Sequence, residues 1–83
     1  MRFNIHKFLL SFSRAMKRAA FDLDMNISTV AEIAGVPRNR VAWYWNYKLR
    51  HDDGEVNPRI GEMVKLLEAV QVEPKQVFRM LGE

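Results

Sequence analysis

Apolar residues recur at spacings of three and four along most of the chain, and Asn, Gly and Pro interrupt this pattern at intervals. Spacings of three and four place side chains on one face of an α-helix, because an α-helix has about 3.6 residues per turn. The pattern therefore predicts a series of amphipathic helices separated by short breaks, with no obvious sheet.

Three helices are predicted in the first half of the chain. The first spans about residues 5–22 and carries one apolar face: Phe8, Leu9, Phe12, Met16, Ala19 and Leu23. Asn26 caps a short second helix, and Gly35 ends it in a left-handed conformation. A third helix runs from about residue 38 to residue 47.

Two further helices are predicted in the second half, so that the fold is all-α with five helices. Pro58 stands at the first position of the fourth helix, where its missing N–H has no partner to lose. The buried stripe of this helix is Ile60, Met63, Val64, Leu67 and Val70. Pro74 starts a last short helix that Gly82 ends. The longest non-helical stretch, residues 49–56, contains a turn signal at Asp53 and Gly54 that favours a small hairpin.

With 83 residues, the chain is long enough for one domain, residues 1–83, and too short for two. It contains no cysteine, which excludes disulfides and thiolate metal sites. No apolar run approaches the roughly 18 residues that a membrane span needs, and the N-terminus does not have the pattern of a secretory signal. We therefore expect a cytoplasmic domain without a cofactor or a metal.

The net charge of +3 is unevenly distributed along the chain. Residues 1–24 carry +3, residues 25–48 carry +2 and residues 49–83 carry −2. A basic first half indicates a polyanionic partner such as a nucleic acid.

Ala31, Gly35 and Val41 have the spacing of a helix-turn-helix. Two short helices that cross steeply need a small residue at the crossing, a glycine at the turn and a branched apolar residue in the angle between them. A plain helical hairpin in a bundle has the same preferences, so these three residues alone leave both structures open.

Residues 26–46 resemble the helix-turn-helix of the Cro/CI repressor family, also called the XRE family, and read NISTVAEIAGVPRNRVAWYWN. Residues 57–78 are similar to the fourth and fifth helices of that family, and read NPRIGEMVKLLEAVQVEPKQVF. The resemblance implies a five-helix, lambda-repressor-like bundle with the helix-turn-helix at about residues 27–47. It also implies a phage, plasmid or bacterial repressor that binds double-stranded DNA at a near-palindromic operator as a homodimer.

The chain departs from the family pattern at three places. Ile27 stands where the family commonly has a glutamine that braces a phosphate contact. The loop before the fourth helix has Asn46 and Tyr47 in place of the usual Asn-Gly, and it extends through Gly54. The N-terminus is also extended ahead of the first helix. These departures concern the expected contacts with DNA and not the expected helices.

The outer face of the third helix follows from its inner face. With Val41, Tyr44 and Trp45 inward, a turn of about 100° per residue puts Asn39 and Trp43 at the centre of the outer face. The residues predicted to read bases are Arg38, Asn39, Ala42, Trp43 and Asn46. Arginine pairs with guanine and asparagine with adenine in the major groove. Trp43 meets a thymine methyl group, or it packs under the long loop; the sequence leaves both open.

Phosphate contacts are predicted around this face, at Ser28, Thr29, Arg40, Tyr47, Lys48, Arg50 and Arg59. The two hydroxyl residues stand in the first turn of the second helix, where backbone N–H groups favour an anion, although they also serve as simple caps. The basic residues flank the loop, which would grip the DNA backbone beside the groove.

A second apolar line on the first helix, with Phe3, Leu10 and Phe21, lies opposite the main stripe. One core cannot take both faces, so we expect a symmetric dimer through this line or through the last helix. The candidates for the dimer contact are Phe3, Leu10, Phe21, Phe78, Met80 and Leu81. The alternative is that the phenylalanines fold back onto the same core.

Competing functions are less well supported by the sequence. An enzyme is not expected, because the two histidines are isolated and no serine has a plausible base partner. A strand-first ribbon-helix-helix fold leaves Gly35 and the last helix unexplained. The stronger rival is a protein-binding module of the same fold, such as an antitoxin or an antirepressor target, because Trp43 and Tyr47 would suit an interface.

Overall fold

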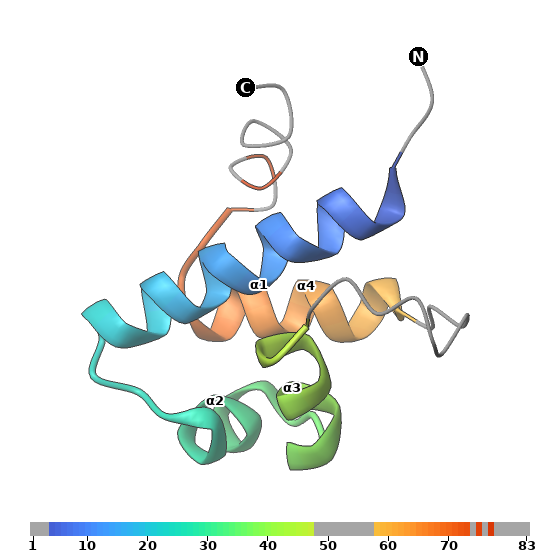
Figure 1. Cartoon of the computed structure of the whole chain (residues 1–83). Helices are drawn as coiled ribbons and strands as arrows, with labels where there is room; N and C mark the ends of the chain where they lie inside the picture. The colour runs from blue at the N-terminus through green and yellow to red at the C-terminus, as the bar shows by residue number, and fades with distance from the viewer. Residues whose placement is uncertain (1–3, 48–57, 74, 76, 78–83) are drawn as a thin grey trace.

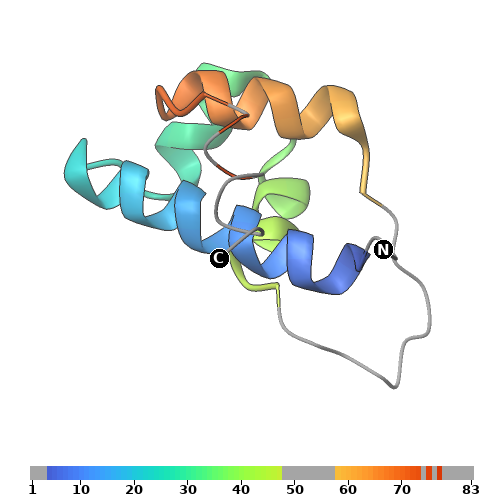
Figure 2. The ribbon, with the colours of Figure 1, turned by 90° about the horizontal axis from the view of Figure 1, so that it is seen from above.

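The computed structural model describes residues 4–47, 58–73, 75 and 77 (Figure 1). These residues form four α-helices and no strand: α1 (Ile5–Asp22), α2 (Ile27–Ala34), α3 (Arg38–Trp45) and α4 (Ile60–Ala69). In Figure 1, α2 and α3 lie below α1 and α4. The view from above in Figure 2 shows that α1 and α4 run in roughly the same direction. The predicted all-α class is therefore confirmed.

The four observed helices are one fewer than the five expected. The predicted last helix falls mostly outside the described residues, and only Lys75 and Val77 are described in its first half, both with helical backbone. The predicted turn at Asp53 and Gly54 also lies outside the described part of the chain.

Helix α1 begins at Ile5 because Asn4 caps it, with its side-chain Oδ1 accepting a hydrogen bond of 3.1 Å from the N–H of Lys7. The predicted bounds of the first helix, about residues 5–22, are therefore confirmed, and the residues ahead of Asn4 lie outside the described part of the chain. The residues that α1 buries are Leu9, Phe12, Ser13, Met16 and Ala20. The buried stripe is turned slightly from the predicted one, which leaves Phe8 and Ala19 half-buried and Leu23 exposed.

Helix α4 begins at Ile60 and not at Pro58. Arg59 keeps an extended backbone and donates its N–H to the hydroxyl of Tyr44 at 2.9 Å, so it precedes the helix. Ile60 is 80% exposed and Val64 is also exposed, which contradicts their predicted burial. The residues that pack inward are Met63, Leu66, Leu67 and Val70. Ile60 is the first residue of α4 and lies outside the part of the helix that packs against the core.

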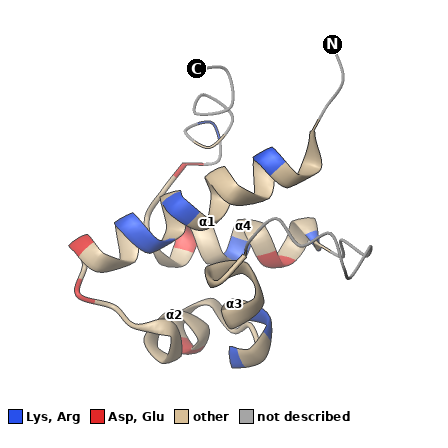
Figure 3. Ribbon diagram, viewed as in Figure 1, with Lys and Arg blue, Asp and Glu red and all other residues tan. Residues whose placement is uncertain are grey.

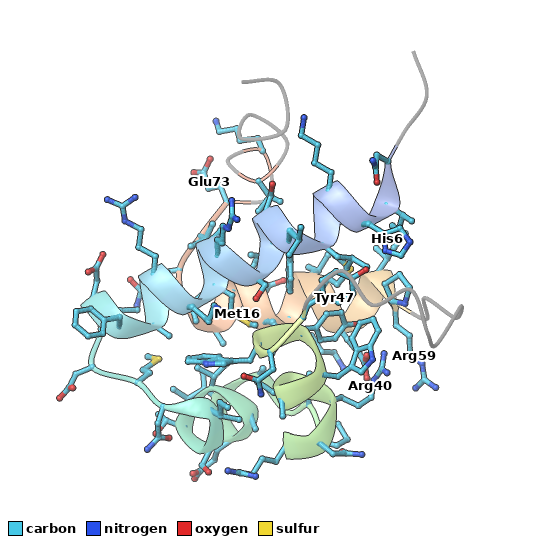
Figure 4. The ribbon with its side chains drawn as sticks, in the orientation of Figure 1. His6, Met16, Arg40, Tyr47, Arg59 and Glu73 are labelled. Carbon is cyan, nitrogen blue, oxygen red and sulfur yellow. The ribbon has the colours of Figure 1, made fainter. Side chains whose placement is uncertain are left out.

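The core lies where the four helices meet, and its two largest fully buried side chains are Tyr44 and Phe12. Their rings are 5.4 Å apart in an edge-to-face arrangement, which is a favoured geometry for aromatic pairs. Met16 from α1 is buried in the same cluster (Figure 4). The core therefore fixes the inner side of α3 against α1.

Candidate nucleic-acid interface

Helices α2 and α3 are two short helices joined by a tight turn, and they lie in the segment where the sequence predicts a helix-turn-helix. Asn26 caps α2 by accepting a hydrogen bond of 2.8 Å from the N–H of Thr29. Gly35 ends α2 with φ of 70°, a left-handed conformation that glycine adopts at little cost. Val36 follows Gly35 in the turn and is buried in the core, so the turn between the two helices is attached to the core.

The inner face of α3 is the predicted one. Val41 and Tyr44 have no exposed surface, and Trp45 is half-buried against the core. The C-terminal end of α3 is fixed to α1, because the hydroxyl of Ser13 donates to the backbone carbonyl of Trp45 at 2.9 Å. The orientation of α3 is therefore set from two sides.

The outer face of α3 carries four polar or small residues. Arg38, Asn39 and Asn46 are exposed and Ala42 is half-buried. At about 100° per residue these four positions fall within about 100° of one another. This exposed strip contains four of the five residues that the sequence predicts to read bases.

Trp43 does not lie at the centre of the outer face, where the sequence analysis placed it. It is half-buried, and its ring meets those of Tyr44 at 5.0 Å and Tyr47 at 5.5 Å, both edge to face. The gain from packing an indole against two rings explains this position. The exposed strip is consequently turned toward Arg38 and Ala42, and Trp43 closes one edge of it.

The other edge of the strip is open and lies beside the start of α2. Arg38 donates from Nε to the hydroxyl of Ser28 at 3.0 Å, which links the two helices at their N-terminal ends. An open hollow of about 360 Å³ lies here, lined by Asn26, Ile27, Ser28, Arg38 and Trp45. Thr29, a predicted phosphate contact, gives its hydroxyl to the Asn26 cap at 3.0 Å, whereas Ser28 is exposed.

Arg40, a predicted phosphate contact, is bound within the protein. Its Nε and Nη2 donate to Oε1 of Glu62 in α4, at 3.0 and 2.8 Å. The Tyr44 hydroxyl also donates to Oε1 of Glu62, at 3.0 Å, and Nη2 of Arg40 lies 3.3 Å from that hydroxyl. We call Arg40, Tyr44 and Glu62 the α3–α4 clamp; Figure 4 shows Arg40 and Arg59 near each other at this end of the molecule.

The electrostatics of the α3–α4 clamp follow from these contacts. The hydrogen bonds from Arg40, followed by that from Tyr44, lower the pKa of Glu62 against the opposing effect of burial. The hydrogen bond to Glu62 raises the pKa of Arg40. Burial is the main cause that raises the pKa of Tyr44. The clamp is therefore a charged pair with a neutral phenol at neutral pH.

Tyr47, another predicted phosphate contact, packs against the start of α1. Its hydroxyl lies 2.5 Å from Nδ1 of His6, and the two rings are stacked with centroids 6.3 Å apart. Burial raises the pKa of the Tyr47 phenol. Figure 4 shows His6 and Tyr47 facing each other across the gap between α1 and the end of α3. Tyr47 thus joins two elements of the fold.

Three of the predicted phosphate contacts belong to the loop region. Lys48 and Arg50 lie outside the described residues. Arg59 is exposed, and its backbone N–H is the group that binds Tyr44. Its side chain stands at the entry to α4, close to the α3–α4 clamp.

Among the predicted dimer residues, the structure describes two. Phe21 is 83% exposed and Leu10 is half-buried, both on α1. Phe3, Phe78, Met80 and Leu81 lie outside the described residues. Basic positions recur along α1 in Figure 3. Four exposed basic residues lie about one turn from the two apolar residues: Lys7, Arg14, Lys17 and Arg18.

Two residues that contact predicted site residues, Glu62 and His6, were not themselves predicted to belong to the site. Glu62 lies 22 positions from Arg40, and His6 lies 41 positions from Tyr47. Neither separation leaves a local spacing signal. The only sequence hint for Glu62 is its place in the first turn of the fourth helix, where an acid is favoured by the helix dipole.

The chain matches no family model, and no curated protein or solved structure matches it. In the described part of the chain, no helix has the length and apolar character required to cross a membrane. The same residues hold no cluster of three or more acidic or histidine side chains suited to a metal ion.

Proposed function

We propose that this chain is a sequence-specific regulator that binds double-stranded DNA, most simply a repressor of the Cro/CI type with a lambda-repressor-like fold. The observation that carries the proposal is the geometry of α3. Its inner side is fully buried at Val41 and Tyr44, and its outer side exposes Arg38 and Asn39. The major groove, about 12 Å wide, admits a helix presented in this way.

Base reading is assigned to the exposed strip of α3. Arg38 suits the O6 and N7 atoms of guanine, and Asn39 suits the N6 and N7 atoms of adenine. Both stand in the first turn of α3, the part of a recognition helix that reaches furthest into the groove. Ala42 and Asn46 extend the same strip by one and two turns.

Phosphate contacts are assigned to the edges of this strip. Ser28 is exposed in the first turn of α2, where free backbone N–H groups and the helix dipole favour an anion. Arg59 is exposed on the other side of α3. These contacts position the protein on the duplex and carry no sequence information.

Binding as a homodimer is part of the same proposal. Phe21 is a large apolar residue with 83% of its surface exposed, which suits a contact with a second copy. Two copies related by a twofold axis would place two α3 helices about 34 Å apart and select a near-palindromic site.

The rival function, a protein-binding module, loses two of the features that favoured it. Trp43 and Tyr47 pack against each other within the chain, with ring centroids 5.5 Å apart. Neither ring therefore presents an open aromatic surface to a partner protein, and among the described aromatic residues only Phe21 is exposed.

Selection of bound duplexes from a random pool tests the proposed function. We expect an enriched site with two related half-sites, and a fall in affinity of roughly tenfold or more when the salt concentration rises fourfold. Arg38→Ala should weaken binding to the enriched site by about 1 to 3 kcal/mol and relax the preference at one base pair.

The matched control is Arg14→Ala, which removes the same charge from an exposed position on α1. It should leave the base preference unchanged. A pool without any enriched sequence, or an affinity that does not respond to salt, would contradict DNA binding and favour a protein partner.

A further inference from the structure

Arg40 follows directly after the two proposed base-reading residues, yet its guanidinium points to α4. Two of its nitrogens donate to one carboxylate oxygen of Glu62, at 3.0 and 2.8 Å. The side chains of Arg40 and Glu62 are only 19% and 14% exposed. This pair is therefore better shielded from water than an ordinary surface ion pair, which contributes little.

Two aromatic rings also contact the same guanidinium. Its central carbon lies 5.2 Å from the ring centroid of Trp43 and 5.3 Å from that of Tyr44. Both distances are within the range of a cation–π contact. The carboxylate of Glu62 thus takes the place that a phosphate oxygen would take on an arginine, because both are anionic oxygens with matching hydrogen-bond geometry.

We propose that Glu62 competes with DNA phosphate for Arg40, and thereby limits the affinity of this protein for duplexes of any sequence. The inference rests on the proposed function and adds an internal regulator of the same surface. Arg40 follows Asn39 in α3 and is the second basic residue of this helix. Its release from Glu62 would place one more cation beside the groove.

The expected effect of releasing Arg40 is defined by its chemistry. One extra phosphate contact steepens the dependence of log affinity on log salt by about 0.9. It strengthens binding to all sequences by the same factor, because phosphates carry no sequence information. A residue that reads bases would instead change the affinity for the selected site alone.

Glu62→Gln is the test variant and Glu68→Gln is its matched control. Both substitutions remove one negative charge from α4, but Glu68 is exposed and outside the α3–α4 clamp. We expect Glu62→Gln to raise affinity for selected and scrambled duplexes alike, by roughly three- to tenfold at 0.1 M salt, with a steeper salt slope by about 0.9. Glu68→Gln should change either affinity by less than about twofold.

The double variant Arg40→Gln with Glu62→Gln identifies the cation responsible. The gain in affinity and in slope should disappear in this variant. If the gain persists, or if Glu62→Gln behaves like Glu68→Gln, the competition by Glu62 is wrong while DNA binding stands. If the unmodified chain binds neither duplex, the proposed function fails first.

A thermal unfolding curve for each variant shows whether it is folded. Should Glu62→Gln fail to fold, Arg40→Gln alone decides the question. The proposal requires that its salt slope equal that of the unmodified chain, because Arg40 makes no phosphate contact while Glu62 holds it. A slope shallower by about 0.9 would show that Arg40 binds phosphate already.

Discussion

Arg38 and Arg40 are two positions apart on α3 and carry the same charge, but their surroundings differ. Arg38 is exposed and donates one hydrogen bond of 3.0 Å to the Ser28 hydroxyl. Arg40 is held by Glu62 and by the rings of Trp43 and Tyr44. One side of α3 is therefore open to a ligand, and the other is closed by α4.

The difference shows that the number of basic residues in a helix does not give the number available to DNA. A carboxylate 22 positions away in the sequence decides which arginine is available. In Figure 3 the basic positions at the start of α3 lie close together, and only their contacts distinguish the two arginines. The open side suits recognition, and the closed side holds the helix in place.

The largest expected effect comes from removing the residue that joins the closed side to the core. Tyr44 has no exposed surface, packs on Phe12 and completes the α3–α4 clamp. Tyr44→Ala should lower the free energy of unfolding by about 3 to 5 kcal/mol, measured by urea denaturation. Tyr44→Phe keeps the ring and should cost about 1 to 2 kcal/mol. Equal losses in the two variants would show that the ring packing contributes nothing.

Alanine at each of the two arginines tests the comparison directly. Arg40→Ala leaves the Glu62 carboxylate without its cationic partner, and should lower the free energy of unfolding by about 1.5 to 3 kcal/mol. Arg38→Ala removes an exposed side chain and should stay within about 0.5 kcal/mol. Urea denaturation of both variants measures the difference. A larger loss for Arg38→Ala would reverse the assignment of the open and closed sides.

Acid should weaken the closed side before the open one. The pKa of Glu62 is lower in the folded protein than its ordinary value of 4.5, chiefly through the hydrogen bonds from Arg40. The stability that this carboxylate contributes is therefore complete above about pH 4.5, and it is lost as the pH falls through the lowered pKa.

Glu62→Gln cannot titrate at this position, so its free energy of unfolding should fall less steeply between about pH 5 and pH 3. The difference in free energy of unfolding between Glu62→Gln and the unmodified protein over this pH range should be smaller than the loss caused by Arg40→Ala. Thermal unfolding at a series of pH values measures it, with Glu68→Gln as the control that retains the steeper fall. Parallel curves for all three proteins would mean that Glu62 gains nothing from Arg40.

Local sequence signals predicted the parts of this fold that depend on neighbouring residues. The bounds of α1, the Asn26 cap and the left-handed Gly35 follow from residues within one turn of each other, and all three are confirmed. The buried face of α3 at Val41 and Tyr44 was also predictable, because helical periodicity fixes it.

The remaining features depend on contacts between distant segments. Helix α4 starts at Ile60, two residues later than predicted, because the N–H of Arg59 donates to the hydroxyl of Tyr44. The outer face of α3 was misplaced at Trp43, since its packing on Tyr47 involves the end of the helix and the following turn. No periodicity reveals such pairings, and the roles of the exposed residues on DNA stay predictions.

Two glycines provide the smallest and most specific test, because alanine at each should have opposite effects. Gly35 has φ of 70°, where an L side chain is strained, and an added Cβ would meet no atom within 4 Å. Gly35→Ala should therefore cost about 1 kcal/mol from backbone strain alone.

Gly61 lies in the first turn of α4, also with open space around an added Cβ, so Gly61→Ala should stabilise the protein by up to about 0.5 kcal/mol. Urea denaturation measures both changes. Gly35 holds the turn that orients the open side of α3, whereas Gly61 precedes the carboxylate that closes the other side. If Gly35→Ala lost no stability, the turn would not be the strained element.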